Sequence, residues 1–70
     1  MNMNIKGHLI NFRNYLTMAK TYASLGNRAK TEELLVAADA ARDSVYREDR
    51  NYPDLADMAK QISEARKNLL

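Results

Sequence analysis

Basic side chains at regular spacing form the clearest chemical pattern in this sequence. Lys6, Arg13 and Lys20 recur every seven residues, and Arg28 and Lys30 follow soon after. With a rise of about 1.5 Å per residue, a helix would place the first three along one stripe, about 10 Å apart. The first 31 residues contain no Asp or Glu. Such a stripe could bind the phosphates of a nucleic acid, with an affinity that falls as salt rises, or the carboxylates of a protein.

The rest of the chain carries the opposite balance of charge. From Glu32 to Leu70 there are nine acidic and six basic side chains, although the whole chain has a formal net charge of +2. An asymmetry of this kind favours an anionic partner for the first segment. The same basic segment could instead complement the acidic helices of its own chain. The sequence leaves both interpretations open.

Residues suited to catalysis or metal binding are few and scattered. The chain has no cysteine and one histidine, His8, so it offers no set of nitrogen and sulfur ligands for a metal. A serine nucleophile needs a nearby base, and apart from His8 the chain has no histidine that could serve as one. Its two glycines, Gly7 and Gly26, are too far apart to form a phosphate-binding loop. Neighbouring carboxylates such as Glu32 and Glu33 are explained by solubility and helix dipoles. We therefore expect no enzyme activity, no metal and no cofactor.

Apolar spacing predicts a helix over residues 5 to 25. One line of side chains recurs at intervals of three and four residues, as on one face of an amphipathic helix: Ile5, Leu9, Phe12, Leu16, Ala19 and Ala23. A second line lies beside it: His8, Tyr15, Met18, Tyr22 and Leu25. Together the two lines cover an arc of roughly 200°, whereas ~100° suffices for one packed face. This helix should therefore contact two neighbours.

Two further helices are predicted, over residues 28 to 47 and 53 to 69. Gly26 supplies the left-handed residue on which helices commonly end, so it should join the first two helices in a hairpin. Pro53 fits the first position of the third helix, where its missing N–H costs nothing. Strand-like alternation is absent. The sequence thus predicts an all-α fold, a single three-helix domain over residues 1 to 70.

Charged residues of the second helix stand at spacings that suit ion pairs. Asp39 and Arg42 are three residues apart, and Asp43 and Arg47 are four apart, so each pair would meet on the helix surface. Exposed pairs of this kind contribute only tenths of a kcal/mol. We expect them to be ordinary features of a solvent-facing surface.

Aromatic and small residues around the predicted turn follow a known hairpin pattern. When Gly26 is taken as the turn glycine, the aligned positions are Tyr15, Ala19, Tyr22, Leu35 and Ala38. With these positions, residues 12 to 45 resemble one tetratricopeptide-repeat unit. Thr31 and Asp43 depart from the motif, which prefers alanine and proline there. A repeat array usually needs about three units, and the position one period after Tyr15 is Asp49, in a predicted loop. The resemblance therefore implies a repeat-like hairpin in a small domain and not a solenoid.

The size of the chain limits its core. Seventy residues bury a limited apolar area, and without cysteine no disulfide can add stability. The wide apolar arc of the first helix then has two candidate covers. Either the third helix lies on it, or a second copy of the chain does so and forms a homodimer.

The surface predicted to bind a partner combines basic and apolar side chains. Its members are Lys6, Arg13, Tyr15, Met18, Lys20, Tyr22, Leu25, Arg28 and Lys30. Aromatic, Met and Arg residues are enriched at interface cores. We therefore expect a small helical protein–protein interaction module, an adaptor or inhibitor that occludes an acidic or mixed apolar surface of a larger protein. The alternatives are nucleic-acid binding through the basic stripe and a purely structural, self-associating subunit.

Neither a membrane span nor a secretory signal is visible in the sequence. The apolar runs are far shorter than the ~20 residues of a transmembrane helix. The first residues, MNMNIKGH, lack the apolar stretch of a secretory signal. We therefore expect a cytoplasmic protein. Compact chains of this kind are common among phage and mobile-element accessory proteins, and we extend that expectation to this one.

Overall fold

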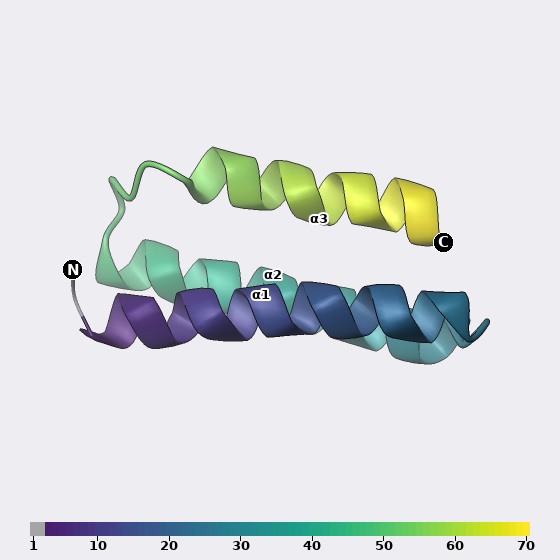
Figure 1. Ribbon diagram of the computed structural model, residues 1–70. Coiled ribbons are helices and arrows are strands. Elements are labelled where there is room, and N and C mark those ends of the chain that lie inside the picture. The colour runs from purple at the N-terminus through teal and green to yellow at the C-terminus, as the bar shows by residue number, and fades with distance from the viewer. Residues whose placement is uncertain (1–2) are drawn as a thin grey trace.

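Three helices make up most of the computed structural model, which describes residues 3 to 70. They are α1 (Met3–Ser24), α2 (Arg28–Glu48) and α3 (Leu55–Leu69), joined by two short connections (Figure 1). No strand occurs in the described part of the chain. The prediction of a small all-α, three-helix fold is confirmed. Residues 1 and 2 of the predicted domain lie outside the described residues.

The helix bounds differ from the predicted ones by at most two residues. The first helix begins two residues before the predicted start and ends one residue before the predicted end, and the second ends one residue later than predicted. Helix ends fray and are the least predictable part of an element. Among the described residues, no helix has the length and apolar character needed to cross a bilayer.

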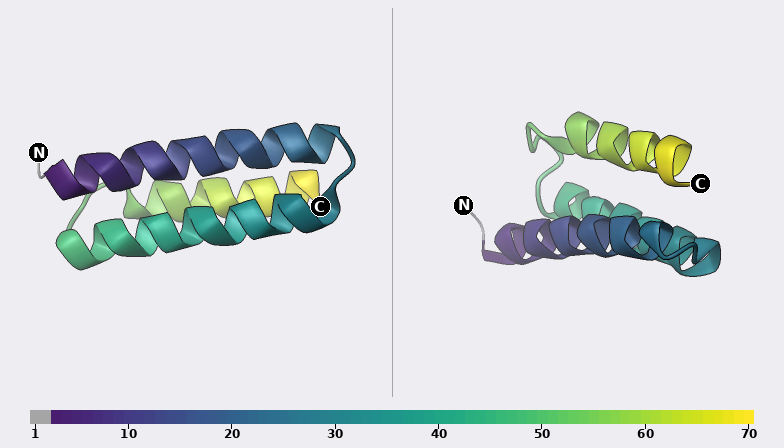
Figure 2. Two further views of the ribbon diagram at one scale, coloured as in Figure 1. Left: turned by 90° about the horizontal axis from the view of Figure 1, so that it is seen from below. Right: turned by 45° about the vertical axis from the view of Figure 1, so that its right-hand side comes forward.

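The turn between α1 and α2 is built around Gly26, which has a φ of +76°. Its N–H donates to the carbonyl oxygen of Ala23 over 3.0 Å, and the N–H of Asn27 donates to that of Tyr22 over 3.0 Å. These two bonds form a Schellman motif. The side-chain Oδ1 of Asn27 then accepts a hydrogen bond from the backbone N–H of Lys30 (3.0 Å) and caps α2. Because the same few residues end one helix and start the next, α1 and α2 lie antiparallel and side by side (Figure 2).

The core lies between these two helices and beneath α3. Its buried apolar side chains are Ile5, Phe12, Leu16, Ala19, Leu34, Leu35, Ala38, Ala41, Val45, Met58, Ile62 and Ala65. Alanines at the contact between α1 and α2 let the helices approach closely because their side chains are small. They also lose no side-chain entropy on burial. Thr31 is a fully buried polar residue. Its Oγ1 donates to the carbonyl oxygen of Asn27 over 2.8 Å, so the buried hydroxyl is satisfied.

The start of α3 corrects the prediction for Pro53. Pro53 was expected at the first helical position, but it lies in a turn, and α3 begins at Leu55. The N–H of Leu55 donates to the carbonyl oxygen of Tyr52 (3.4 Å), and the N–H of Met58 donates to that of Asp54 (2.9 Å). A short turn therefore precedes the helix, with Asp54 at its N-cap position. Proline is compatible with this turn because its fixed φ suits the second residue of a β-turn.

Two polar contacts fasten α3 to α2. The Nε of Arg42 donates to the carbonyl oxygen of Leu55 over 3.0 Å at the start of α3. Near the other end of α3, the guanidinium of Arg66 pairs with the carboxylate of Glu32. Helix α1 contacts both other helices, as its wide apolar arc predicts, but its contact with α3 is the sparsest of the three interfaces. The third helix therefore leans toward α2 and leaves part of α1 uncovered.

Candidate protein-interaction surfaces

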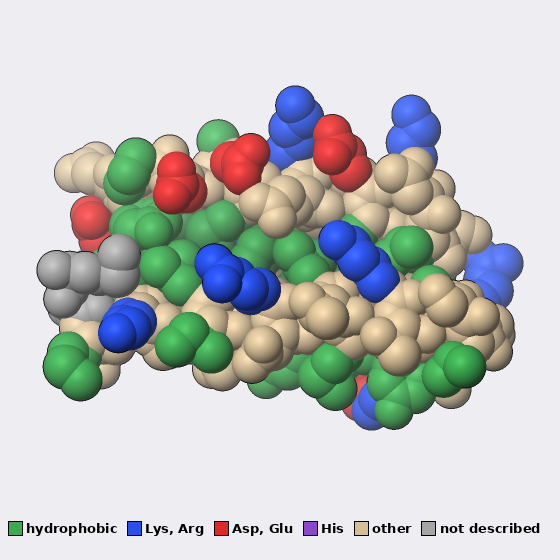
Figure 3. Space-filling model, in the orientation of Figure 1, with side chains coloured by type: hydrophobic (Ala, Val, Ile, Leu, Met, Phe, Trp, Pro, Cys, Tyr) green, Lys and Arg blue, Asp and Glu red, His purple; other side chains and the backbone are tan. Residues whose placement is uncertain are grey.

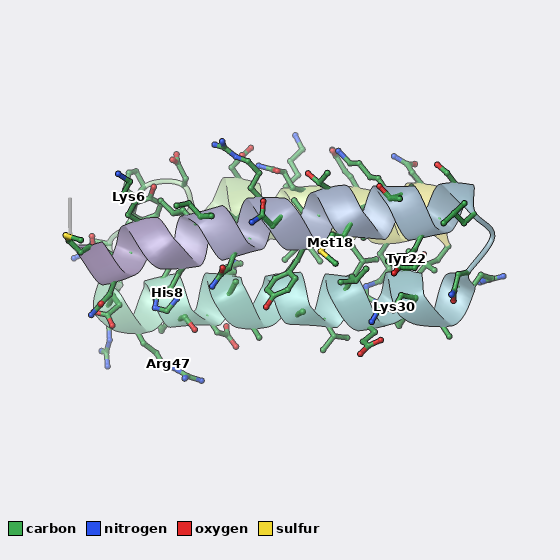
Figure 4. The ribbon with its side chains drawn as sticks, turned by 60° about the horizontal axis from the view of Figure 1, so that its bottom comes forward. Lys6, His8, Met18, Tyr22, Lys30 and Arg47 are labelled. Atoms are coloured by element: carbon green, nitrogen blue, oxygen red, sulfur yellow. The ribbon has the colours of Figure 1, made fainter. Side chains whose placement is uncertain are left out.

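The nine residues predicted to bind a partner lie on two separate sides of the hairpin. Lys6 projects to one side of α1, whereas Met18 and Tyr22 lie on the other side, toward the edge that α1 shares with α2 and Lys30 (Figure 4). Helical spacing places Arg13 and Lys20 with Lys6, and it places Tyr15 with Tyr22 and Leu25 with Met18. Arg28 is exposed at the first residue of α2. The predicted site is therefore two surfaces, and they can be considered one at a time.

The basic side of α1 forms one wall of a groove between α1 and α3. A hollow of about 320 Å³ is lined by Arg13 and Lys20 on the α1 side and by Asp54 and Asp57 on the α3 side. Its floor is apolar and is made of Leu9, Phe12, Leu16 and Met58. A second hollow of about 260 Å³ continues the groove toward the C-terminal end of α3, where Lys20 faces Gln61 and Glu64.

The groove separates charges of opposite sign. In Figure 3 an apolar band runs between the two helices, with Lys and Arg side chains along α1 and Asp and Glu side chains along α3, while Lys or Arg side chains of α3 project away from the band. None of the ion pairs among residues 3 to 70 joins the two walls, because they link Lys30 with Glu33, Arg42 with Asp43, and Arg66 with Glu32. The groove therefore presents a basic row and an acidic row to whatever occupies it.

The other surface is the outer face of α1, which carries no charged side chain. The only Lys or Arg residues of α1 are Lys6, Arg13 and Lys20, which form the basic row, and α1 has no Asp or Glu. Four large apolar side chains are exposed on α1: Met3 (85%), Ile10 (50%), Met18 (42%) and Leu25 (72%), the last just beyond its final residue. We call these four residues, with the uncharged polar side chains between them, the outer face. Interface cores are depleted in charge and enriched in Met.

Two hydroxyls on the exposed side of α1 donate hydrogen bonds to their own helix. The Oγ1 of Thr21 donates to the carbonyl oxygen of Thr17 over 3.2 Å, and the Oγ of Ser24 donates to that of Lys20 over 3.1 Å. A hydroxyl already bonded to its own helix loses little when water is removed from it. These two hydroxyls can therefore be covered by another protein at a small desolvation cost.

The two predicted tyrosine anchors are less available than expected. Tyr15 and Tyr22 are half-buried and pack against the core. The Lys30 ammonium lies 5.9 Å from the centroid of the Tyr22 ring and 3.2 Å from a carboxylate oxygen of Glu33. These contacts hold the tyrosines mainly as structural side chains at the edge of the hairpin. Met18 and Leu25 are the predicted apolar residues that the structure leaves most exposed.

Sequence reasoning missed Met3 and Ile10, which the structure leaves exposed on α1. A signal for them exists in the sequence, since they are seven residues apart, as are Met18 and Leu25. Both pairs fall on helix positions from which every charged residue is absent. An exposed helix surface without charge is the pattern that would have found the whole outer face.

The described residues contain no cluster of three His, Cys, Asp or Glu side chains that could hold a metal ion. His8 is half-buried and lies on the α2 side of α1 (Figure 4). The carboxylates of the groove wall stand along a helix and do not converge on one point.

Comparisons with known proteins do not add a family to this description. Residues 12 to 45 do form a helical hairpin with Gly26 at its turn, which is the geometry that the tetratricopeptide-repeat resemblance implies. The resemblance remains one of hairpin geometry, because no protein-family model, curated protein sequence or solved structure matches the chain.

Proposed function

We propose that the chain is a non-enzymatic protein-interaction module that binds a larger protein through the outer face of α1 and occludes the surface it covers. One observation carries this proposal: α1 combines exposed large apolar side chains with a complete absence of charge on the same face. A helix that is apolar on more than one side is normally covered on each of them. Exposed apolar side chains repeated along one helix face, with no charge among them, match the composition of an interface core.

The outer face suits a helix-in-groove mode of recognition. Met3 to Leu25 spans about 33 Å at 1.5 Å per residue, and apolar anchors repeated along a helix are the usual contacts of this mode. Met18 and Leu25 are taken as the main anchors because they lie close to the turn, where backbone hydrogen bonds around Gly26 connect α1 with α2. Arg28 is exposed close by, at the start of α2, where it can pair with acidic groups at the rim of the partner's groove.

Nucleic-acid binding through the basic row is the second candidate, and the groove weakens it. Asp54 and Asp57 line the same hollow as Arg13 and Lys20, and Glu64 lines its continuation. Three carboxylates across the groove lower the positive potential that phosphates would meet. A protein partner therefore fits the charge distribution better than a phosphate backbone does.

The test is capture of partners from lysate of the source cells by the tagged chain, with matched variants. Met18→Glu and Leu25→Glu should each lose the captured protein, because each buries an unpaired charge in the complex. Val36→Glu is the control, since Val36 is also exposed (56%) but lies on α2. Nuclease treatment should leave capture unchanged. Capture that survives both outer-face variants, or that disappears with nuclease, would refute the proposal.

A further inference from the structure

The two walls of the groove carry charges in matching register. Arg13 and Lys20 are seven residues apart on α1, and Asp57 and Glu64 are seven apart on α3. Each pair is therefore separated by about 10 Å along its helix. Helices α1 and α3 run in the same direction (Figure 1). Arg13 and Asp57 line one hollow, and Lys20 and Glu64 line the next, so the two rows lie at the same level along the groove.

These four charges form no ion pair among residues 3 to 70, and one of them, Asp57, accepts a hydrogen bond at its Oδ2 from the Nε2 of Gln61 on the same helix (2.7 Å). All four side chains are exposed. The hollows keep the rows apart, because α3 is fastened to α2 by Arg42 and Arg66 and not to α1. An occupant of the groove must therefore offer acidic groups to α1 and basic groups to α3, at a spacing of about 10 Å.

We propose that this occupant is a second copy of the chain, related to the first by a two-fold axis that runs parallel to α1 and α3 between the facing grooves. Such an axis lays α1 of one copy against α3 of the other without shifting the level along the helices. Arg13 then faces the partner's Asp57, and Lys20 faces the partner's Glu64. A two-fold interface repeats every contact, so each of these two pairs occurs twice and the dimer contains four.

The apolar floor supports the same arrangement. Leu9 and Leu16 of α1 and Met58 of α3 lie at the bottom of the groove, so two facing grooves bring together one apolar centre between four helices. Four helices around a shared apolar core form a stable packing unit. Leu16 and Met58 are already buried within one chain and Leu9 is half-buried, so of these three side chains Leu9 has the most apolar area left for a second copy to cover. A two-fold axis perpendicular to the helices would instead place α1 on α1 and oppose like charges.

This proposal concerns the groove and is independent of the outer face. The chain at about 100 µM, measured by size-exclusion chromatography with light scattering, should show twice the chain mass of 8.0 kDa. The variants R13E/K20E and D57K/E64K should each weaken dimerisation by at least about tenfold, because like charges then face each other. K60E/K67E is the matched control, since these lysines have the same spacing on α3 but do not line the groove. It should dimerise as the unchanged chain does.

Mixing the two reversal variants is the decisive measurement. Mixing leaves the groove charges within each chain as they were, but between the two chains it restores every opposite-charge pair. Native mass spectrometry should therefore show a heterodimer and little of either homodimer. If a reversal variant fails to fold, as judged by circular dichroism, the fourfold variant R13E/K20E/D57K/E64K replaces it. That variant restores attraction across its own groove and should dimerise with itself but not with the unchanged chain.

Three results would overturn the proposal. The first is a monomeric unchanged chain at about 100 µM, and the second is a dimer that both reversal variants retain. The third is a mixture of the two reversal variants that stays monomeric. Where the fourfold variant is used in place of the mixture, the third result is free exchange of that variant with the unchanged chain. Loss of the dimer in Met18→Glu together with its retention in the reversal variants would move self-association to the outer face and would also overturn it. Loss of partner capture with an intact, charge-dependent dimer would refute only the proposed function.

Discussion

The two glycines of the chain should respond in opposite directions to the same substitution. Gly7 lies within α1, whereas Gly26 has a φ of +76° in the turn. An added Cβ would meet no atom within 4 Å at either position. Replacing each glycine by alanine therefore changes the backbone preference at that position and nothing else in the packing. The pair isolates the contribution of the Gly26 turn to the stability of the fold.

The expected magnitudes follow from these two backbone conformations. At Gly26, alanine must adopt the left-handed region, which costs an L-residue about 1–2 kcal/mol. At Gly7, alanine removes the entropic cost of a glycine in a helix and should stabilise the fold by about 0.5–1 kcal/mol. For a domain of this size, a change of 1 kcal/mol shifts Tm by about 4–8 °C. Gly26→Ala should thus melt several degrees below the unchanged chain, and Gly7→Ala a few degrees above it.

Urea unfolding followed by circular dichroism measures both changes. The midpoint should move in opposite directions while the slope of free energy against urea stays constant, because neither variant alters the surface exposed on unfolding. All three chains must be compared at one protein concentration, since self-association would make the midpoint depend on it. Equal or increased stability of Gly26→Ala would show that the turn does not require a left-handed residue. Destabilisation by Gly7→Ala would contradict the placement of Gly7 in a regular, exposed helix.

Three further substitutions test the packing of the core and of α3. Leu35→Ala should lower the free energy of unfolding by about 2–5 kcal/mol, because the side chain is fully buried and a cavity would remain. Its neighbour Val36→Ala should change it by less than about 0.5 kcal/mol, since Val36 is exposed on the same helix. Arg42→Gln should speed hydrogen exchange of the α3 amides more than that of α1, because it removes the bond from Arg42 Nε to the Leu55 carbonyl. An equal increase in exchange for the amides of α3 and α1 would show that this bond does not hold α3.

The fold was predictable because local rules and packing agree along most of the chain. Gly26 ends α1 with a left-handed residue and Asn27 caps α2, so both ends of the turn follow from residue type. The apolar periodicity of α1 is borne out by the buried residues from Ile5 to Ala19. Such agreement between levels is what makes a sequence readable.

Arg42 shows where sequence rules stop. Its spacing from Asp39 predicted an ion pair on the surface of α2, but its Nε donates to the carbonyl oxygen of Leu55 instead. A long side chain on one helix can donate to a backbone carbonyl oxygen of another segment, and spacing along one helix contains no information about that segment. The same limit applies to the groove, since the acidic row of α3 meets the basic row of α1 only after the chain has folded.

The two proposed surfaces are compatible because the part of the outer face that carries Met18 and Leu25 lies on the other side of α1 from Lys20. Met18 and Lys20 are two residues apart, which corresponds to about 200° around a helix with 3.6 residues per turn. A second copy that covers Arg13 and Lys20 therefore leaves Met18 and Leu25 exposed, and the two-fold axis turns the outer faces of the two copies away from each other. Such a dimer would bind two sites on one target with a gain from linkage alone. A partner that carries a single site would instead bind each copy independently, so the stoichiometry of the captured complex distinguishes the two modes of occlusion.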